Sequence, residues 1–174
     1  MGKRSTCRIL VTGPPGVGKT TLVRKIVDGL THRRPVGFYT TEIRERGVRK
    51  GFELMSFDGR RGLLSHVDIH GPHRVGKYGV DVEGFDQFLD AIQWPTLDVG
   101  LVVIDEIGKM ECSSEKFRAL VRRILESNLA LFATIAQRGT GLIADVKTRG
   151  DVELLELSKR NRDSLAKEIV GRLA

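Results

Sequence analysis

Apolar residues along this chain follow two spacings, the continuous run of a buried strand and the three-to-four-residue repeat of a helix face. Residues 7–12 form an apolar run and predict a strand, while residues 20–30 repeat apolar positions on one helix face. Residues 99–104 form a second run, typical of a central strand covered on both sides. This alternation predicts an α/β fold with a mostly parallel sheet between two helical layers.

The stretch between these runs predicts an insertion in the sheet. Residues 35–43 and 51–57 have strand character and flank a charged turn at 44–50, so we expect a β-hairpin. Residues 65–80 are rich in Gly and His and have no steady period, which predicts a loop. A short helix near residues 84–92 should follow.

The rest of the chain continues the alternation without an internal repeat or a long linker. A single domain spanning residues 1–174 is therefore expected. We expect a helix over 114–126, a strand over 129–135, a loop, a strand over 152–157, and a C-terminal helix that turns Leu165, Ile169, Val170 and Leu173 inward.

Charge indicates the kind of partner, and cysteine content indicates the cellular compartment. Lysine and arginine number 29 against 22 acidic residues, and this net charge of +7 favours anionic partners, with nucleotides expected and nucleic acid possible. Cys7 and Cys112 form no disulfide framework, and the N-terminal apolar run is too short for a signal peptide or a membrane span. We expect a cytoplasmic monomer that does not bind membranes.

One segment between the first strand and the first helix carries a specific chemical pattern. It matches G-x-x-x-x-G-K-[ST], the phosphate-binding P-loop (Walker A), through Gly13, Pro14, Pro15, Gly16, Val17, Gly18, Lys19 and Thr20. Glycines let backbone N–H groups turn toward phosphates at a helix N-terminus. Lys19 should reach the β and γ phosphates, and the Thr20 hydroxyl should bind Mg²⁺.

Two carboxylates end the second apolar run, as in a Walker B motif. Asp105 is predicted to hold Mg²⁺ with Thr20, and Glu106 to activate the attacking water as general base. The segment that follows should also contact the nucleotide, which gives a predicted set of Asp105, Glu106, Ile107, Gly108 and Lys109. Lys19 completes the predicted catalytic residues.

Strings outside these two motifs are more distinctive. They are Gly37-Phe38-Tyr39-Thr40 with Glu42, Arg44 and Gly47; Arg49 with Gly51-Phe52; Tyr78-Gly79-Val80-Asp81-Val82; Asp105 through Glu111 (DEIGKME); and Asn161-Arg162-Asp163. On these residues the chain resembles the THEP-type nucleoside-triphosphatases over nearly its full length. The resemblance implies slow, Mg²⁺-dependent hydrolysis of nucleoside triphosphates with broad base tolerance. Residues 136–139 depart from it, because the family usually carries proline there.

Several further residues have both a functional and a structural interpretation. Lys109 could meet the γ-phosphate or pair with Glu111, and Arg138 could be an arginine finger or a surface residue. Asn161 and Arg162 could flank the base, or Asn161 could cap the last helix. The turn cations Arg44, Arg46, Arg49 and Lys50 could form an anion site. A metal site at His66, His70 and His73 is not favoured. Trp94 is expected to be a packing anchor.

Three functions remain open from the sequence. The favoured one is a nucleoside-triphosphate phosphohydrolase. The same loop, metal and carboxylate would also serve a small-molecule or polynucleotide kinase, in which a substrate hydroxyl replaces water. The third is a nucleotide-gated module that binds RNA or a protein.

Overall fold

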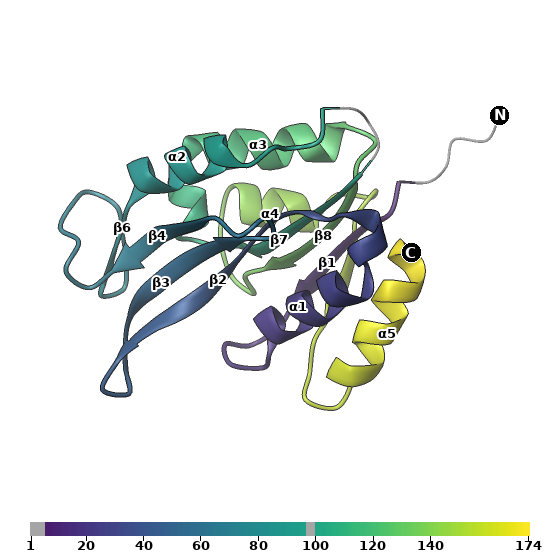
Figure 1. Cartoon of the computed structure of the whole chain (residues 1–174), viewed down its shortest axis with the longest axis horizontal. Helices are drawn as coiled ribbons and strands as arrows, with labels where there is room; N and C mark the ends of the chain where they lie inside the picture. Colours follow the sequence, from purple (N-terminus) through teal and green to yellow (C-terminus); the bar gives the residue numbers. More distant parts are fainter. Residues whose placement is uncertain (1–5, 97–99) are drawn as a thin grey trace.

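The fold is built on one nine-stranded sheet, seen in the computed structural model, which describes residues 6–96 and 100–174 (Figure 1). The strand order is β5-β6-β4-β3-β2-β7-β8-β1-β9. Five of these strands form the parallel half: β1 (Arg8–Thr12), β2 (Val36–Glu45), β7 (Leu101–Ile107), β8 (Ala130–Ile135) and β9 (Glu153–Glu156). The predicted α/β architecture is confirmed.

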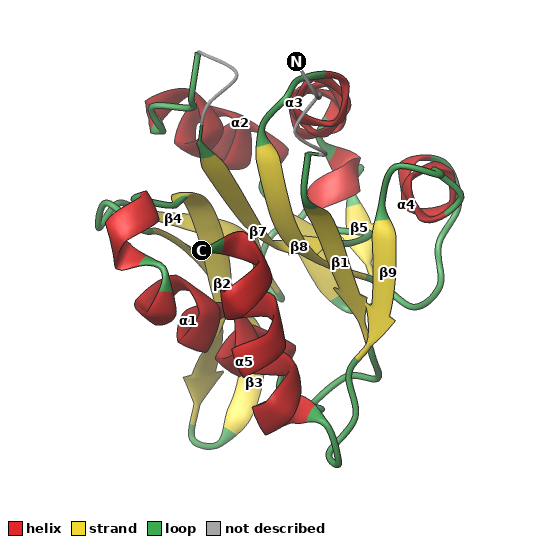
Figure 2. Ribbon diagram, turned by 90° about the vertical axis from the view of Figure 1, so that its right-hand side faces the viewer, coloured by secondary structure: helices red, strands yellow, loops and turns green. Residues whose placement is uncertain are grey.

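Helices cover both faces of the sheet, because alternate residues of each central strand point to opposite sides. Ile9 and Val11 of β1 pack on one face with α1 (Lys19–Gly29) and α5 (Arg162–Leu173). Leu10 packs on the other face with α2 (Val82–Ala91), α3 (Glu115–Glu126) and α4 (Leu142–Lys147). Figure 2 shows α1 and α5 side by side, apart from α2, α3 and α4.

The antiparallel half begins with the predicted hairpin. β2 pairs with β3 (Val48–Ser56) through a two-residue turn in which Arg46 and Gly47 have φ of 48° and 80°. Two consecutive positive φ values give a turn whose twist matches that of the strands. Both strands therefore extend into residues 44–50, which were predicted to form the turn.

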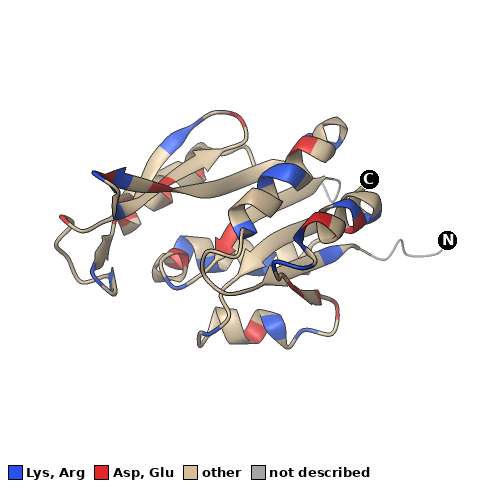
Figure 3. Ribbon diagram, turned by 90° about the horizontal axis from the view of Figure 1, so that it is seen from below, with Lys and Arg blue, Asp and Glu red and all other residues tan. Residues whose placement is uncertain are grey.

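Basic and acidic residues are interspersed along strands and helices in Figure 3.

Three further strands extend this half, and here the predicted loop over residues 65–80 is wrong. β4 (Arg61–His66) pairs with β3, β6 (Tyr78–Val80) pairs with β4, and β5 (Arg74–Val75) pairs with β6. The strands are short and interrupted by turns, so the segment shows no apolar period. Their pairing depends on backbone groups that sequence periodicity does not reveal.

Other boundaries also shifted. The loop predicted after residue 135 contains α4, a helix of only six residues, and short 3₁₀ helices occupy Thr31–Arg33 (η1) and Glu111–Ser113 (η2). Helix α2 starts at Val82 because the Asp81 side chain accepts a hydrogen bond from the Gly84 N–H group. Val99, the predicted start of the central strand, lies outside the described residues.

Within the described ranges, no helix is both long enough and apolar enough to cross a membrane.

Gly37 lets β2 lie against β7. Its φ is 144°, and a Cβ there would lie 1.8 Å from the Val103 carbonyl oxygen. A side chain at this position would force apart two strands whose ends form the cavity described below.

We predict that Gly37→Ala lowers the free energy of unfolding by more than about 2 kcal/mol, because backbone strain adds to a steric clash. Gly171→Ala is the matched control. It lies within α5 with nothing inside 4 Å of its Cβ position, and should raise stability by roughly 0.5–1 kcal/mol. Urea unfolding measures both; equal effects would show that the β2–β7 approach tolerates a side chain.

Candidate functional site

The P-loop sequence connects β1 to the N-terminus of α1, as predicted. Gly16 and Gly18 have φ of 77° and 107°, values that favour glycine, and nothing lies within 4 Å of either Cβ position. Gly18 caps α1 without a side-chain hydrogen bond, and the first turn of α1 carries no acidic residue. The helix start therefore presents backbone N–H groups and the positive end of its dipole toward an open space.

Lys19 is held over this loop. Its ammonium nitrogen donates a hydrogen bond to the Gly13 carbonyl oxygen at 2.8 Å and lies 3.7 Å from Oε2 of Glu106. The side chain is 14% exposed, so its charge faces the site rather than bulk water. The first residue of α1 is thereby directed at the carboxylates near the end of β7.

Asp105 joins three elements through two hydrogen bonds. The Thr20 hydroxyl of α1 donates to Oδ2 at 2.6 Å, and the Thr134 hydroxyl of β8 donates to Oδ1 at 2.5 Å. Asp105 is only 2% exposed, and burial raises the pKa of its carboxyl group. The hydroxyls of Thr134 and Thr20 and the charge of Lys19 oppose that rise, because each favours the ionised form.

Two more carboxyl groups lie beside Asp105. Burial raises the pKa of Glu106, while Lys19 lowers it and Asp105 raises it again. Burial also raises the pKa of Glu111 well above its ordinary value, and the nearby charges of Glu106 and Asp105 add to this effect. The site thus places three acids in three different environments, an arrangement typical of functional sites.

These groups line a cavity of about 600 Å³. Its inner part is formed by the P-loop residues Pro15, Gly16, Gly18, Lys19 and Thr20, with Thr21 of α1 and the three acids. The outer part lies against the antiparallel half of the sheet and is lined by Thr40, Thr41, Glu42, Arg49, Phe52, Leu64 and Val75, together with Lys109, Met110 and Ala136. The cavity is therefore larger than the phosphate-binding loop alone.

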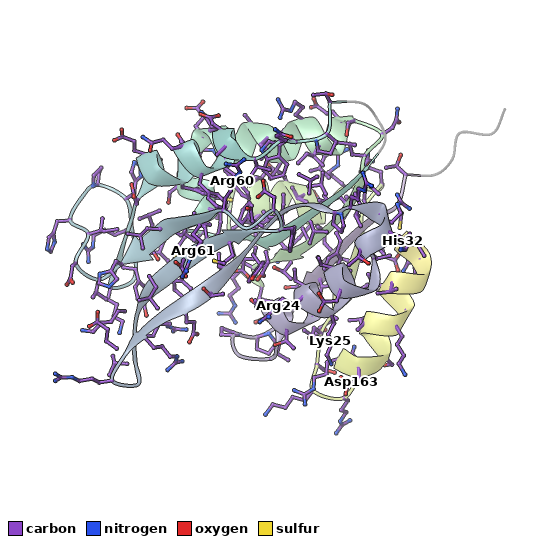
Figure 4. All side chains as sticks on the ribbon, in the orientation of Figure 1. Arg24, Lys25, His32, Arg60, Arg61 and Asp163 are labelled. Atoms are coloured by element: carbon purple, nitrogen blue, oxygen red, sulfur yellow. The ribbon has the colours of Figure 1, made fainter. Side chains whose placement is uncertain are left out.

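A second cavity of about 240 Å³ lies between α1 and α5, lined by Gly18, Thr21, Leu22, Lys25, Arg162 and Asp163. The Lys25 ammonium lies 2.8 Å from Oδ1 of Asp163, and Figure 4 shows these two side chains on neighbouring helices. The Asn161 side chain does not cap α5; it accepts from the Ser158 N–H group and donates to the Glu156 carbonyl. It holds the loop that leads to this cavity.

The side chains of some predicted site residues do not line the cavity. Ile107 and Val17 are buried in the two cores, and Arg138 is exposed and does not line the cavity. Lys109 lines the cavity, and no ion pair joins it to Glu111 within the part of the chain that is described. Gly13 contributes its carbonyl oxygen rather than a surface, because a Cβ there would lie 2.9 Å from the Leu157 carbonyl oxygen.

Two of the hairpin arginines, Arg44 and Arg49, share the carboxylate of Glu42. Arg44 and Arg49 both hydrogen-bond to Glu42, at 2.7 and 2.8 Å. Arg49 also donates to the Tyr78 hydroxyl at 3.0 Å and lies 5.3 Å from the centre of the Phe52 ring. The contact of Arg49 with Tyr78 connects β3 to β6. Trp94 is a packing anchor as predicted, donating from its indole nitrogen to the Leu89 carbonyl at 2.9 Å.

The residues missed from the sequence include three that interact with the site acids: Thr134, Glu111 and Lys147. Thr134 is the one polar residue in the apolar run of β8, and that was an available signal. Lys147 donates to the Gln137 carbonyl at 2.7 Å; burial lowers the pKa of its ammonium group, and the charge of Glu106 opposes this in part. No sequence spacing relates Lys147 to Glu106, because α4 reaches the site only through the fold.

The oxygen atoms at Thr20 and Asp105 fit Mg²⁺. This ion takes hard oxygen ligands, keeps several waters, and is usually bound through one or two protein groups plus substrate phosphates. A hydroxyl and a carboxylate 2.6 Å apart beside Lys19 supply that donor set. Among the described residues no group of three or more His, Cys, Asp or Glu could hold a metal, and the histidines do not form such a group.

A Walker A loop, a Walker B strand end and a mainly parallel sheet with helices on both faces define the class: a P-loop NTPase fold. The chain belongs to the NTPase family, whose model matches residues 8–170. It is 42% identical over 164 residues to nucleoside-triphosphatase THEP1 of Thermotoga petrophila, covering 94% of this chain and 90% of the relative. It is 38% identical over 178 residues to the human cancer-related nucleoside-triphosphatase, covering 93% and 94%.

A solved structure supports the same relationship. The crystal structure of THEP1 from Aquifex aeolicus matches with a TM-score of 0.83 at 36% identity, covering 95% of this chain and 98% of that one. Its similarity over almost the whole length includes the antiparallel half, so the resemblance based on the sequence strings is confirmed.

We predict that Glu111→Gln raises the free energy of unfolding more at pH 8.5 than at pH 5. The folded-state pKa of Glu111 lies above the ordinary value of 4.5, so its contribution to stability is present at low pH and is lost as the pH rises through the folded-state pKa. Glutamine has no such proton to lose. Urea unfolding at both pH values measures the difference, with Glu45→Gln at the exposed hairpin turn as control. A benefit that does not grow with pH would contradict the assignment.

Proposed function

We propose that this protein hydrolyses nucleoside triphosphates to nucleoside diphosphates and phosphate, with Mg²⁺ and with broad tolerance of the base. The observation that carries this proposal is the convergence of Lys19, Thr20, Asp105 and Glu106 in one cavity at the carboxyl ends of β1 and β7. The names of the relatives support it, since they are nucleoside-triphosphatases.

Each side chain has a role that follows from its position. Backbone N–H groups from Gly16 to Thr20 bind the phosphate oxygens, and Lys19 exchanges its bond to the Gly13 carbonyl for the β and γ phosphates. Thr20 and Asp105 would hold Mg²⁺, which neutralises charge on the phosphate oxygens when bound. Thr134 orients Asp105 through its hydroxyl.

Glu106 is the general base in this proposal. Its side chain is 30% exposed and faces the cavity beside Lys19, so it can reach a water molecule positioned by the γ-phosphate. It accepts a proton as the water oxygen bonds to the γ-phosphorus and the bond to the diphosphate breaks. Lys19 stabilises the charge that develops on the leaving phosphate oxygens.

The direction of the bound nucleotide follows from the loop. Lys19 and Thr20 mark the β and γ phosphates, so the α-phosphate and nucleoside extend past Thr21 toward the smaller cavity between α1 and α5. The residues that line this cavity include charged and aliphatic side chains but no aromatic ring. Such a site favours recognition of phosphates over recognition of a particular base, which agrees with broad tolerance.

The test is phosphate release from ATP, GTP, CTP and UTP with Mg²⁺ and with EDTA. We expect steady release from all four that needs Mg²⁺, and loss of both affinity and turnover in Lys19→Ala, because the ammonium contacts the phosphates in both ground and transition states. Wild-type release by Lys19→Ala would remove the P-loop from the reaction. Release from a single nucleotide would contradict broad tolerance.

A second candidate, phosphoryl transfer to an organic hydroxyl, is favoured by the outer part of the large cavity. Phe52, Leu64, Val75 and Met110 give it an apolar wall, which attack by a water molecule does not require. An acceptor bound against this wall would share the cavity with Lys19 and Glu106. The same experiment, repeated with labelled ATP and a pool of nucleosides and RNA ends, distinguishes the two: transfer of label to one acceptor with negligible release alone would establish a kinase.

We predict that Glu106→Gln still binds Mg-ATP but turns over at least about 10²-fold more slowly, the usual size of a general-base contribution. The amide keeps the shape of the side chain and cannot accept the proton. Equilibrium nucleotide binding and single-turnover release measure the two quantities separately. Glu45→Gln is the surface control, and unchanged release in Glu106→Gln would remove that residue from its role.

A further inference from the structure

Glu111 is a buried acid at the site to which the proposed reaction gives no role. It is the first residue of η2, is 5% exposed, and lines the large cavity beside Glu106. A carboxyl group is rarely buried without a charged partner, because ionising it away from water is costly. Its surroundings therefore decide whether it is charged or neutral.

Those surroundings favour the neutral form. No cationic side chain in the described ranges forms an ion pair with Glu111, and neighbouring Lys109 is exposed. The charged groups that face it from β7 are Glu106 and Asp105, and both raise its pKa in addition to burial. Hydrogen bonds from the backbone N–H groups of Glu111 and Gly108 oppose this only in part. Burial and the neighbouring anions thus favour the protonated form of Glu111, and a protonated carboxyl group can donate a hydrogen bond.

Gly108 is where the two glutamates meet. A Cβ at Gly108 would lie 2.8 Å from Oε1 of Glu106 and 2.8 Å from Oε2 of Glu111. Both carboxyl groups therefore lie around the same residue, which has no side chain to separate them. Oε2 of Glu106, its other oxygen, is the one that faces Lys19 at 3.7 Å.

The two environments divide the roles of the pair. Burial raises the pKa of both glutamates, but the charge of Lys19 opposes that rise at Glu106, whereas the neighbouring anions add to it at Glu111. A neutral carboxyl group donates its O–H to a nearby carboxylate oxygen. That bond would fix one oxygen of Glu106 and leave the other directed at the cavity.

We propose that Glu111 is a positioning residue, whose carboxyl group holds Glu106 in the orientation that accepts a proton from the attacking nucleophile. The proposal rests on the proposed function and deepens it. In the hydrolytic step the water proton passes to Glu106, the water oxygen bonds to the γ-phosphorus, and the diphosphate leaves. The Glu111 proton stays on Glu111 throughout, and Gly108 keeps the space between the two side chains open.

The test compares two substitutions at one position. In Glu111→Ala we expect kcat to fall by roughly 10²-fold, because Glu106 loses its fixed orientation, while KM for Mg-ATP changes less than about threefold. Glu111→Gln should retain kcat within about threefold of wild type, because the amide N–H replaces the O–H donor. Glu45→Gln again controls for removal of a surface carboxylate.

Two more variants keep the test decisive if Glu111→Ala folds poorly. Gly108→Ala has no left-handed φ to lose, and its Cβ would push the carboxyl groups apart, so kcat should fall with circular dichroism unchanged. Adding Glu111→Ala to Glu106→Gln should cause little further loss, because Glu111 acts only through Glu106.

The outcomes separate this inference from the function beneath it. No Mg²⁺-dependent release by wild type would end the proposed function. Loss of turnover in Glu106→Gln with wild-type kcat in Glu111→Ala would leave that function standing and overturn the role of Glu111. Equal loss in Glu111→Gln and Glu111→Ala would also overturn it, because the acid would then act as an anion or a base rather than as a donor.

Discussion

The site depends on keeping the Asp105 carboxyl group buried at the end of the central strand. Removing a carboxylate from water is costly, and two hydroxyls and one ammonium offset that cost here. The hydroxyls come from α1 and β8, so the same hydrogen bonds that satisfy Asp105 fix the start of the P-loop helix relative to the sheet. Thr20 is a predicted magnesium ligand and is adjacent to Lys19. Losing its hydrogen bond to Asp105 would therefore displace both side chains.

The cavity lies where the strand order requires it. β1 lies between β8 and β9, and the chain leaves β1 and β8 toward helices on opposite faces of the sheet. Loops at the carboxyl ends of such strands diverge and leave a crevice. The antiparallel half then supplies a wall that an ordinary open parallel sheet would lack, and Glu42, Arg49 and Tyr78 hold that wall together across strands β2, β3 and β6.

Acidic groups concentrated at the site have a stability cost. Asp105, Glu106 and Glu111 all have raised pKa values, so the folded protein binds protons there more tightly than the unfolded chain does. Around neutral pH this arrangement opposes folding, and the two apolar cores on either side of the sheet must offset it. During the reaction, a bound cation and a lysine directed at the phosphates would change the charge around these three acids. That role is a reason for keeping the acids together despite their cost to stability.

The sequence by itself determined the phosphate loop, the Walker B acids, the hairpin and the alternation of strands and helices, because these depend on local residue spacing. Residues 65–80 were misread, since short strands paired through backbone groups leave no apolar period. That the Ile107 side chain faces the core could not be predicted, because a position next to a motif does not reveal which face a side chain takes. The positions of Glu111, Thr134 and Lys147 near Asp105 and Glu106 were decided only by the tertiary structure, which brings together residues that no spacing in the chain relates.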